Sequence, residues 1–212
     1  IACDLHPKFT TTILAQDLGS ELHLPVVGVQ HHHAHAVALM AERGINEMIA
    51  IVCDGYGYGS DGQAWGGEIL HCSREGSFRR LGHLEEQPLI GGDLATRYPL
   101  RMAVGILSDL ADIKEWLLSN STHLPHGKEE VDIILQQLKK HPLPKTTSCG
   151  RVLDAISAVL GICYERTYEG EPAMKLESAA IKGRDVLKLE PMIEDNILNT
   201  TALVHEIFNQ RN

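Results

Sequence analysis

The sequence has few cysteines, and they are widely separated. The five are Cys3, Cys53, Cys72, Cys149 and Cys163. An odd number of isolated cysteines without a C-x-x-C pair excludes both a disulfide framework and a cysteine-rich zinc site. We therefore expect reduced thiols and a cytoplasmic protein.

Aromatic residues and basic charge are also scarce. Phe, Trp and Tyr make up 5% of the sequence, and 19 Lys and Arg face 28 Asp and Glu, for a formal net charge of -9. A nucleic-acid-binding protein normally carries a basic face and stacking aromatic side chains. We therefore expect no nucleic-acid partner.

Long apolar runs are missing as well. None approaches the about 18–20 residues that a membrane-spanning helix needs, so no membrane partner is expected. The 212 residues are 43% hydrophobic and 22% charged, as in an ordinary globular protein with a real core. The chain opens on Ile1 within an apolar stretch, and we expect it to be part of a longer protein.

The order of the predicted elements favours an α/β or α+β fold. A helix is expected over residues 31–43, ended by Gly44, and a glycine-rich loop over 55–59. Strands are predicted at 25–29, 48–53, 65–73 and 78–84, and helices at 93–109, 128–140, 150–163, 171–182 and from about 200.

Histidine is unusually frequent in this sequence. It occurs 12 times, and four of the copies lie within residues 31–35. On a helix His31 and His35 are four residues apart, so both imidazoles project from one face within reach of one metal ion. Asp54 closes a predicted strand at the same end of the sheet, which suggests a His₂-carboxylate set suited to Fe(II), Zn(II) or Mn(II). A solvated or helix-capping histidine cluster, and an Asp-Gly turn at Asp54, remain the alternatives.

Glycine-rich segments supply weaker signals. Residues 54–62 match neither a Walker A loop nor a dinucleotide fingerprint, and a hairpin is the simpler interpretation. Residues 89–93 and 148–151 each lead into a predicted helix, where an anion site or ordinary capping is possible. Cys149 is either activated at its helix start or simply buried. No catalytic nucleophile or base is assigned.

Several motifs together resemble the C-terminal transferase region of the hydrogenase maturation carbamoyltransferase family HypF. The matching segments are residues 4–7, 29–36, 54–57, 61–62, 65–68, 91–95, Pro99, Arg101, 148–151, 154–155 and 168–171. The resemblance implies an ASKHA-type, actin-like α/β fold with two RNase H-like lobes around a nucleotide cleft. Residues 1–92 would form the first lobe, with a mixed sheet and helices, and 93–212 a mostly helical, incomplete second lobe.

The resemblance also implies the site residues and the reaction. His31, His35 and Asp54 would bind Fe(II) or Zn(II), and the ATP/AMP moiety of carbamoyl adenylate would lie near the nucleotide-binding residues, which are Gly55, Gly57, Asp154, Gly170 and Glu171. The carbamoyl group would pass to the C-terminal cysteine of the partner HypE during maturation of the cyanide ligand of NiFe hydrogenase.

Proteins of this family have further segments before and after the region that resembles this sequence. We expect the N-terminal and C-terminal segments of its own full-length protein to be further partners of this chain. Without them we expect the chain to make no carbamoyl adenylate and to be catalytically impaired on its own. Three alternatives stay open: a non-catalytic interaction module that needs neither metal nor nucleotide, a relative of the tRNA threonylcarbamoyl transferase TsaD, and a metal-dependent hydrolase. The hydrolase lacks a Glu within the histidine motif to act as general base.

Overall fold

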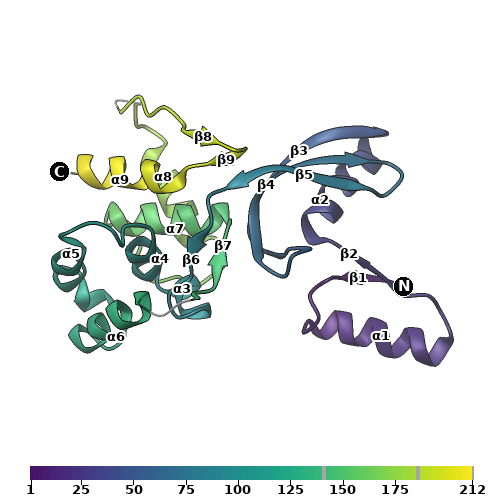
Figure 1. The fold of residues 1–212 in the computed structure, drawn as a ribbon, viewed down its shortest axis with the longest axis horizontal. Helices are drawn as coiled ribbons and strands as arrows, with labels where there is room; N and C mark the ends of the chain where they lie inside the picture. The colour runs from purple at the N-terminus through teal and green to yellow at the C-terminus, as the bar shows by residue number, and fades with distance from the viewer. Residues whose placement is uncertain (140–141, 185–186, 212) are drawn as a thin grey trace.

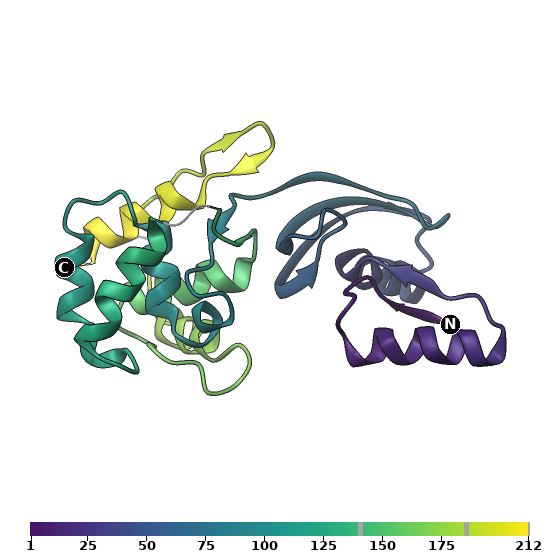
Figure 2. The same cartoon turned by 60° about the horizontal axis from the view of Figure 1, so that its bottom comes forward.

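The computed structural model describes residues 1–139, 142–184 and 187–211. It contains an N-terminal unit, a long antiparallel sheet and a group of helices (Figure 1). Turned by 60°, the sheet is seen to bridge the N-terminal unit and the helical part (Figure 2). The N-terminal unit is a βαβ crossover, in which β1 (Ala2–Asp4) and β2 (Val27–Val29) are parallel and α1 (Thr10–Leu22) connects them.

Helix α2 (His31–Arg43) has the predicted bounds. Its N-cap is Gln30, whose side-chain oxygen accepts a hydrogen bond from the His33 N–H at 2.8 Å. Gly44 ends the helix with φ 64°, in the left-handed region that glycine tolerates. The prediction of a helix over 31–43 is confirmed.

Strand β3 (Glu47–Tyr58) pairs with β4 (Ala64–Ser73), which pairs in turn with β5 (Phe78–Leu84). The predicted strands at 48–53, 65–73 and 78–84 are confirmed. The predicted loop at 55–59 is wrong over most of its length, because β3 continues to Tyr58. Its register is irregular after Cys53, and pairing resumes where Gly57 faces Trp65. Backbone hydrogen bonds to β4 therefore outweigh the turn preference of glycine.

Short strands from later in the chain extend this sheet. They are β6 (Gln87–Pro88), β7 (Lys145–Thr146), β8 (Ile193–Glu194) and β9 (Ile197–Leu198). The order is β6-β7-β4-β5-β9-β8, with β3 on the other edge of β4. Segments distant in the sequence thus meet at one sheet. The proposed lobe boundary after residue 92 stays a prediction.

The helical part contains most of the later chain. Its elements are α3 (Asp93–Arg97), α4 (Pro99–Ile106), α5 (Ile113–Ser119), the 3₁₀ turn Ser121–His123, α6 (Lys128–Leu138), α7 (Cys149–Val159), α8 (Glu171–Ala180) and α9 (Thr200–Gln210). The predicted helix 93–109 divides at Tyr98, because Pro99 cannot donate a backbone hydrogen bond and starts a new helix. Residue 140, the end of another predicted helix, lies outside the described residues.

Two apolar cores hold the molecule together. The larger one lies among the helices and includes the fully buried Leu100, Met102 and Leu117. The smaller one joins α2 to β3 and β4 through Met40 and Leu70. Within the described ranges, no helix has the length and apolar character needed to cross a bilayer.

Candidate metal centre

The histidine run begins where β2 ends and packs beside β3, which continues past Asp54 instead of ending there as predicted. His31 is the first residue of α2, immediately after β2, and His35 lies one turn later on the same helix. Asp54 lies within β3, and α2 packs against this strand. The arrangement places three potential ligands on two elements that share the smaller core.

The three ligand atoms converge. Nε2 of His31 lies 3.2 Å from Nε2 of His35 and 3.2 Å from Oδ2 of Asp54. One ligand atom from each residue falls within 4.8 Å of the others. The structure therefore brings together the three residues that sequence reasoning selected as metal ligands.

Asp4 is an additional residue of this centre that sequence reasoning did not single out as a site residue. Its Oδ2 lies 2.8 Å from Nδ1 of His31. A carboxylate at this distance holds the ring proton on Nδ1, so the lone pair of Nε2 faces His35 and Asp54. The signal in the sequence was an acidic residue two positions before His6, at the end of a short apolar stretch.

His32 lies beneath the centre and is fully buried. The side-chain amide nitrogen of Gln30 lies 3.1 Å from Nδ1 of His32, which makes that nitrogen an acceptor and leaves the proton on Nε2. Nε2 points toward Asp54 with 3.5 Å between the atoms, but without hydrogen-bond alignment. Gly57 permits this packing, because a Cβ there would lie 2.4 Å from Cε1 of His32.

The charge state of Asp54 suits a metal ligand. Burial acts to raise the pKa of this carboxyl, but the contact with His32, the backbone N–H of Gly55 and the charges that His31 and His32 carry when protonated together lower it below its usual value. The Gly55 N–H donates to Oδ1 at 2.6 Å. Asp54 is therefore anionic at neutral pH, and Oδ2 is the oxygen left for a ligand.

The residues fit a divalent transition metal. Oδ2 of Asp54 is buried and has no hydrogen-bond partner among the described residues, although it faces two imidazoles. Two donors bound about 2.1 Å from one ion are about 3.0–3.4 Å apart, which agrees with both 3.2 Å separations. Two imidazoles and a carboxylate suit Fe(II) or Zn(II), and a partly exposed His31 leaves one side open.

The start of α7 covers the strand that carries Asp54. Ser148 is the N-cap of α7, and its hydroxyl also donates to the carbonyls of Asp54 and Gly55 at 3.0 and 2.9 Å. Gly150 permits the approach, because a Cβ there would lie 3.1 Å from Cα of Gly55. Gly55 itself has open space where a side chain would stand.

Asp154 lies inside the protein on α7, only 1% exposed. Burial raises its pKa to about 6, although the positive charges of Arg151 and Arg166 oppose the shift. Its Oδ2 is 2.8 Å from Nη2 of Arg151. The Nε of Arg151 and the hydroxyl of Ser157, both buried on the same helix, have no hydrogen-bond partner within the part of the chain that the structure describes.

Gly170 and Glu171 form the start of α8, at a distance from the histidines along the chain. Gly170 is the N-cap, with φ 75°. Glu171 accepts hydrogen bonds from the backbone and side chain of Thr167 at 2.6 and 2.8 Å, and its other oxygen is 2.7 Å from Nζ of Lys175. These contacts, that with Lys175 first, lower its pKa to about 2. The carboxylate organises the turn before α8.

The glycine-rich segment before α3 is part of a structural network. Arg101 is 3% exposed and donates to Glu130, to the carbonyl of Ile90 and to Gln137. A Cβ at Gly91 would lie 2.7 Å from Nη1 of Arg101. The guanidinium is therefore engaged by protein groups at this segment.

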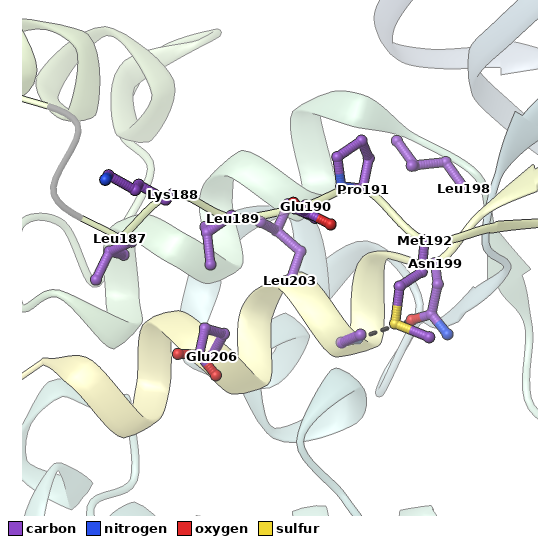
Figure 3. Close-up of a pocket in the computed structure, with 11 residues that line it drawn as sticks. Leu187, Lys188, Leu189, Glu190, Pro191, Met192, Leu198, Asn199, Leu203 and Glu206 are labelled. Atoms are coloured by element: carbon purple, nitrogen blue, oxygen red, sulfur yellow. Dashed lines mark hydrogen bonds between the residues drawn. The ribbon is translucent and has the colours of Figure 1, made fainter.

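A groove of about 460 Å³ lies along α9 (Figure 3). Apolar side chains form most of its wall, among them Leu189, Met192 and Leu203. None of the three converging ligands lines it. The groove therefore does not belong to the candidate metal centre.

Family models cover both parts of the chain. A model described as "Carbamoyltransferase, Kae1-like Domain, second subdomain" matches residues 50–212, and one described as "HypF Kae1-like domain" matches residues 1–42. The chain belongs to the HypF Kae1-like family. Membership confirms the resemblance found in the sequence. The first model ends at residue 42 within α2 and the second begins at residue 50 within β3, so each model includes part of the candidate ligand set.

Similar proteins carry the same family name. The chain is 44% identical to "Probable carbamoyltransferase HypF" of Methanocaldococcus jannaschii, covering 98% of this chain and 27% of that protein. It is 37% identical to "Carbamoyltransferase HypF homolog" of Cupriavidus necator, covering 98% of this chain and 54% of that protein. The chain thus spans only part of the length of these relatives.

Solved structures share the fold. The crystal structure of T. kodakarensis HypF matches with a TM-score of 0.89 at 43% identity, covering 99% of this chain and 28% of that one. Full-length HypF in its phosphate- and nucleotide-bound form matches with a TM-score of 0.85 at 34% identity, covering 99% and 32%. The predicted α/β fold of ASKHA type is therefore confirmed.

Proposed function

We propose that this chain carries the carbamoyl-transfer site of a HypF-type carbamoyltransferase. The donor is carbamoyl adenylate and the acceptor is the C-terminal cysteine of HypE, in the maturation of the cyanide ligand of NiFe hydrogenase. The observation that carries the proposal is the convergence of His31, His35 and Asp54 in a chain of this family.

The transfer exchanges one bond for another. The acceptor sulfur, as a thiolate, forms a bond to the carbonyl carbon, and the bond from that carbon to the phosphate oxygen breaks, so that AMP leaves. A bound Fe(II) or Zn(II) would polarise the carbonyl or neutralise the phosphate. Asp4 orients His31 for this role through the 2.8 Å contact with Nδ1.

Residues around α7 and α8 are proposed to hold the nucleotide. Open space at Gly55 lets a phosphate approach the backbone, and Gly57 keeps the strand close to the histidines. Ribose hydroxyls would satisfy the buried polar atoms beside Asp154, for which the described ranges supply no hydrogen-bond partner. Gly170 and Glu171 would lie near the nucleoside, with Glu171 already held by Thr167 and Lys175. A full-length HypF structure that this chain matches over 32% of its length is described as phosphate- and nucleotide-bound, which supports a nucleotide site in proteins of this family.

The first experiment measures metal content per chain by inductively coupled plasma mass spectrometry after anaerobic purification. We expect near-stoichiometric iron or zinc in the wild type and loss of the metal in the H31A/H35A variant. His71→Ala is the matched control, since this half-exposed histidine pairs with Glu47 on the sheet and not with the cluster. A wild-type chain without metal would contradict the metal centre.

The second experiment tests transfer directly. Metal-loaded chain receives carbamoyl adenylate and HypE, and mass spectrometry follows the C-terminal peptide of HypE while AMP release is measured. Thiocarboxamide on HypE, even at the reduced level expected of a chain without the rest of the protein, supports the proposal if it disappears with H31A/H35A. Binding of HypE without AMP release and without affinity for AMP indicates a non-catalytic interaction module instead.

A further inference from the structure

Two cysteines that are distant in sequence meet where the start of α7 covers β3. Cys53 lies on β3 directly before Asp54, and Cys149 is the first residue of α7. The Cys53 thiol is close enough to Cys149 to act, after burial, as a cause that raises the pKa of Cys149 to about 11. Both line one cavity of about 520 Å³, whose wall also includes the apolar side chains Ile51, Leu84 and Leu198.

The sheet register explains why the two side chains meet. Cys53 faces Gly67 across the β3–β4 pair, and residues directly opposite in an antiparallel pair point to the same face. A Cβ at Gly67 would lie 2.6 Å from the carbonyl oxygen of Thr147. The chain leading into α7 therefore occupies the face toward which Cys53 points, and Cys149 follows two residues after Thr147.

Neighbouring residues hold this arrangement in place. The hydroxyl of Ser148, the residue before Cys149, donates to the carbonyls of Asp54 and Gly55, the residues after Cys53. A Cβ at Gly66 would lie 2.9 Å from Cα of Ser148, which shows how closely the two backbones approach. The proximity of the thiols thus follows from packed backbone rather than from a side-chain rotamer alone.

The five cysteines differ in their access to solvent. Cys53 is exposed and Cys149 half-buried, whereas Cys72 and Cys163 are buried. Cys3 is also half-buried, but it lies on β1 in the separate two-stranded sheet. Small oxidants therefore reach Cys53 first, and Cys149 is the thiol beside it.

We propose that Cys53 and Cys149 form a redox-sensitive dithiol site, which a low-molecular-weight disulfide such as oxidised glutathione converts to an intramolecular disulfide. The Cys53 thiolate attacks the oxidant, forming a mixed disulfide and releasing one reduced thiol. Cys149 then attacks Sγ of Cys53, and the second reduced thiol leaves. The dithiol loses two electrons and two protons, which the oxidant takes up.

The cross-link joins β3 to α7 at the residue before Asp54. It closes a loop that contains β4, β5 and the helices α3–α6, so the unfolded state loses conformational freedom. We expect a higher thermal midpoint for the oxidised wild type, reversed by dithiothreitol, and no such shift in C53S.

The test uses the reduced chain, incubated with oxidised glutathione and then alkylated and digested with trypsin. The expected product is a monomer that has lost two hydrogens, with peptides 44–74 and 146–151 linked and fragment ions assigning the bond to Cys53 rather than Cys72. C149S is expected to stop at a glutathione adduct on Cys53. C3S is the matched control and is expected to oxidise like the wild type.

Two outcomes would overturn the proposal. One is a stable glutathione adduct on Cys53 of the wild type, which would place the thiols too far apart to react. The other is disulfide-linked dimers, or bonds to Cys3, as the main product. The mapping is carried out on the wild type, so it does not depend on the folding of a variant.

Discussion

Oδ2 of Asp4 lies 2.8 Å from Nδ1 of His31, across 27 positions of sequence. The contact follows from the βαβ unit, because β1 and β2 are parallel and Asp4 pairs with Val29, two residues before His31. The end of one strand thus lies beside the first turn of the helix that follows the other. This carboxylate fixes both the tautomer and the orientation of a candidate metal ligand.

Asp4→Asn should weaken metal binding while leaving the fold intact. Asn keeps the shape of the side chain but removes the charge that supports the Nδ1 proton, and loss of such a partner costs about 10–100-fold in affinity. Titration of the apo-chain with Zn(II) against a chelator measures the change. Asp17→Asn, on an exposed position of α1, is the matched control. Equal affinities for wild type and D4N would contradict this role.

Gly57→Ala should destabilise the chain by about 1–3 kcal/mol, as overpacking of a filled site does. The new Cβ would lie 2.4 Å from Cε1 and 2.7 Å from Nε2 of His32, a fully buried side chain with nowhere to move. Gly55→Ala is the matched control, because no heavy atom lies within 4 Å of its added Cβ. Urea unfolding measures both variants, and equal stabilities would count against the close approach.

Arg101→Met should destabilise the helical part by about 3–5 kcal/mol, because it leaves the Glu130 carboxylate buried without its partner. Both side chains are 3% exposed. The exposed pair of Arg97 and Glu165, at 62% and 46% exposure, supplies the control, and Arg97→Met should change stability far less than Arg101→Met. Chemical denaturation measures the free energy of unfolding of both variants. Similar losses in Arg101→Met and Arg97→Met would contradict the prediction that the buried ion pair matters more than the exposed one.

Glu171 should contribute to the loss of stability in acid. Its pKa falls from 4.5 to about 2, with Lys175 as the largest cause and Thr167 next. The unfolded chain therefore binds more protons between these values, so the stabilisation is present above pH 4.5 and is lost as pH falls toward 2. Glu171→Gln should lose less stability over this window than the wild type.

Thermal unfolding at a series of pH values measures this effect. Glu177→Gln, an exposed position on the same helix, controls for the removal of one negative charge. It should follow the wild-type curve through the acid window. Parallel curves for Glu171→Gln and the wild type would show that the contacts with Thr167 and Lys175 do not shift the titration of Glu171.

Some of the fold follows from local pattern. The helix over 31–43 has a polar N-cap, apolar residues on one side and a glycine at its end, and each signal acts within one helix. Helix α1 gives no such signal. Its buried residues are the small Thr12, Ala15 and Gly19, while Ile13 and Leu14 are exposed, so no large apolar stripe marks its buried face.

At the glycines of β3, tertiary contacts override the local sequence preference. Local preference favours a loop at Gly55 and Gly57, but pairing with β4 and packing against His32 make this segment a strand. Gly57 is needed for close approach rather than for a turn. One sequence cannot separate these two uses of glycine, because the contacting residues come from another element.

By itself, the sequence determined the local features: the helix that places His31 and His35 on one face, the strand before Asp54, and the motifs that mark the family. Helical spacing is a property of neighbouring residues, so it can be read directly. Tertiary structure alone decided that Asp4 orients His31, that His32 supports Asp54 from below, and that Cys53 meets Cys149. These relationships depend on strand register and on how α7 packs on β3, which join residues far apart in the chain.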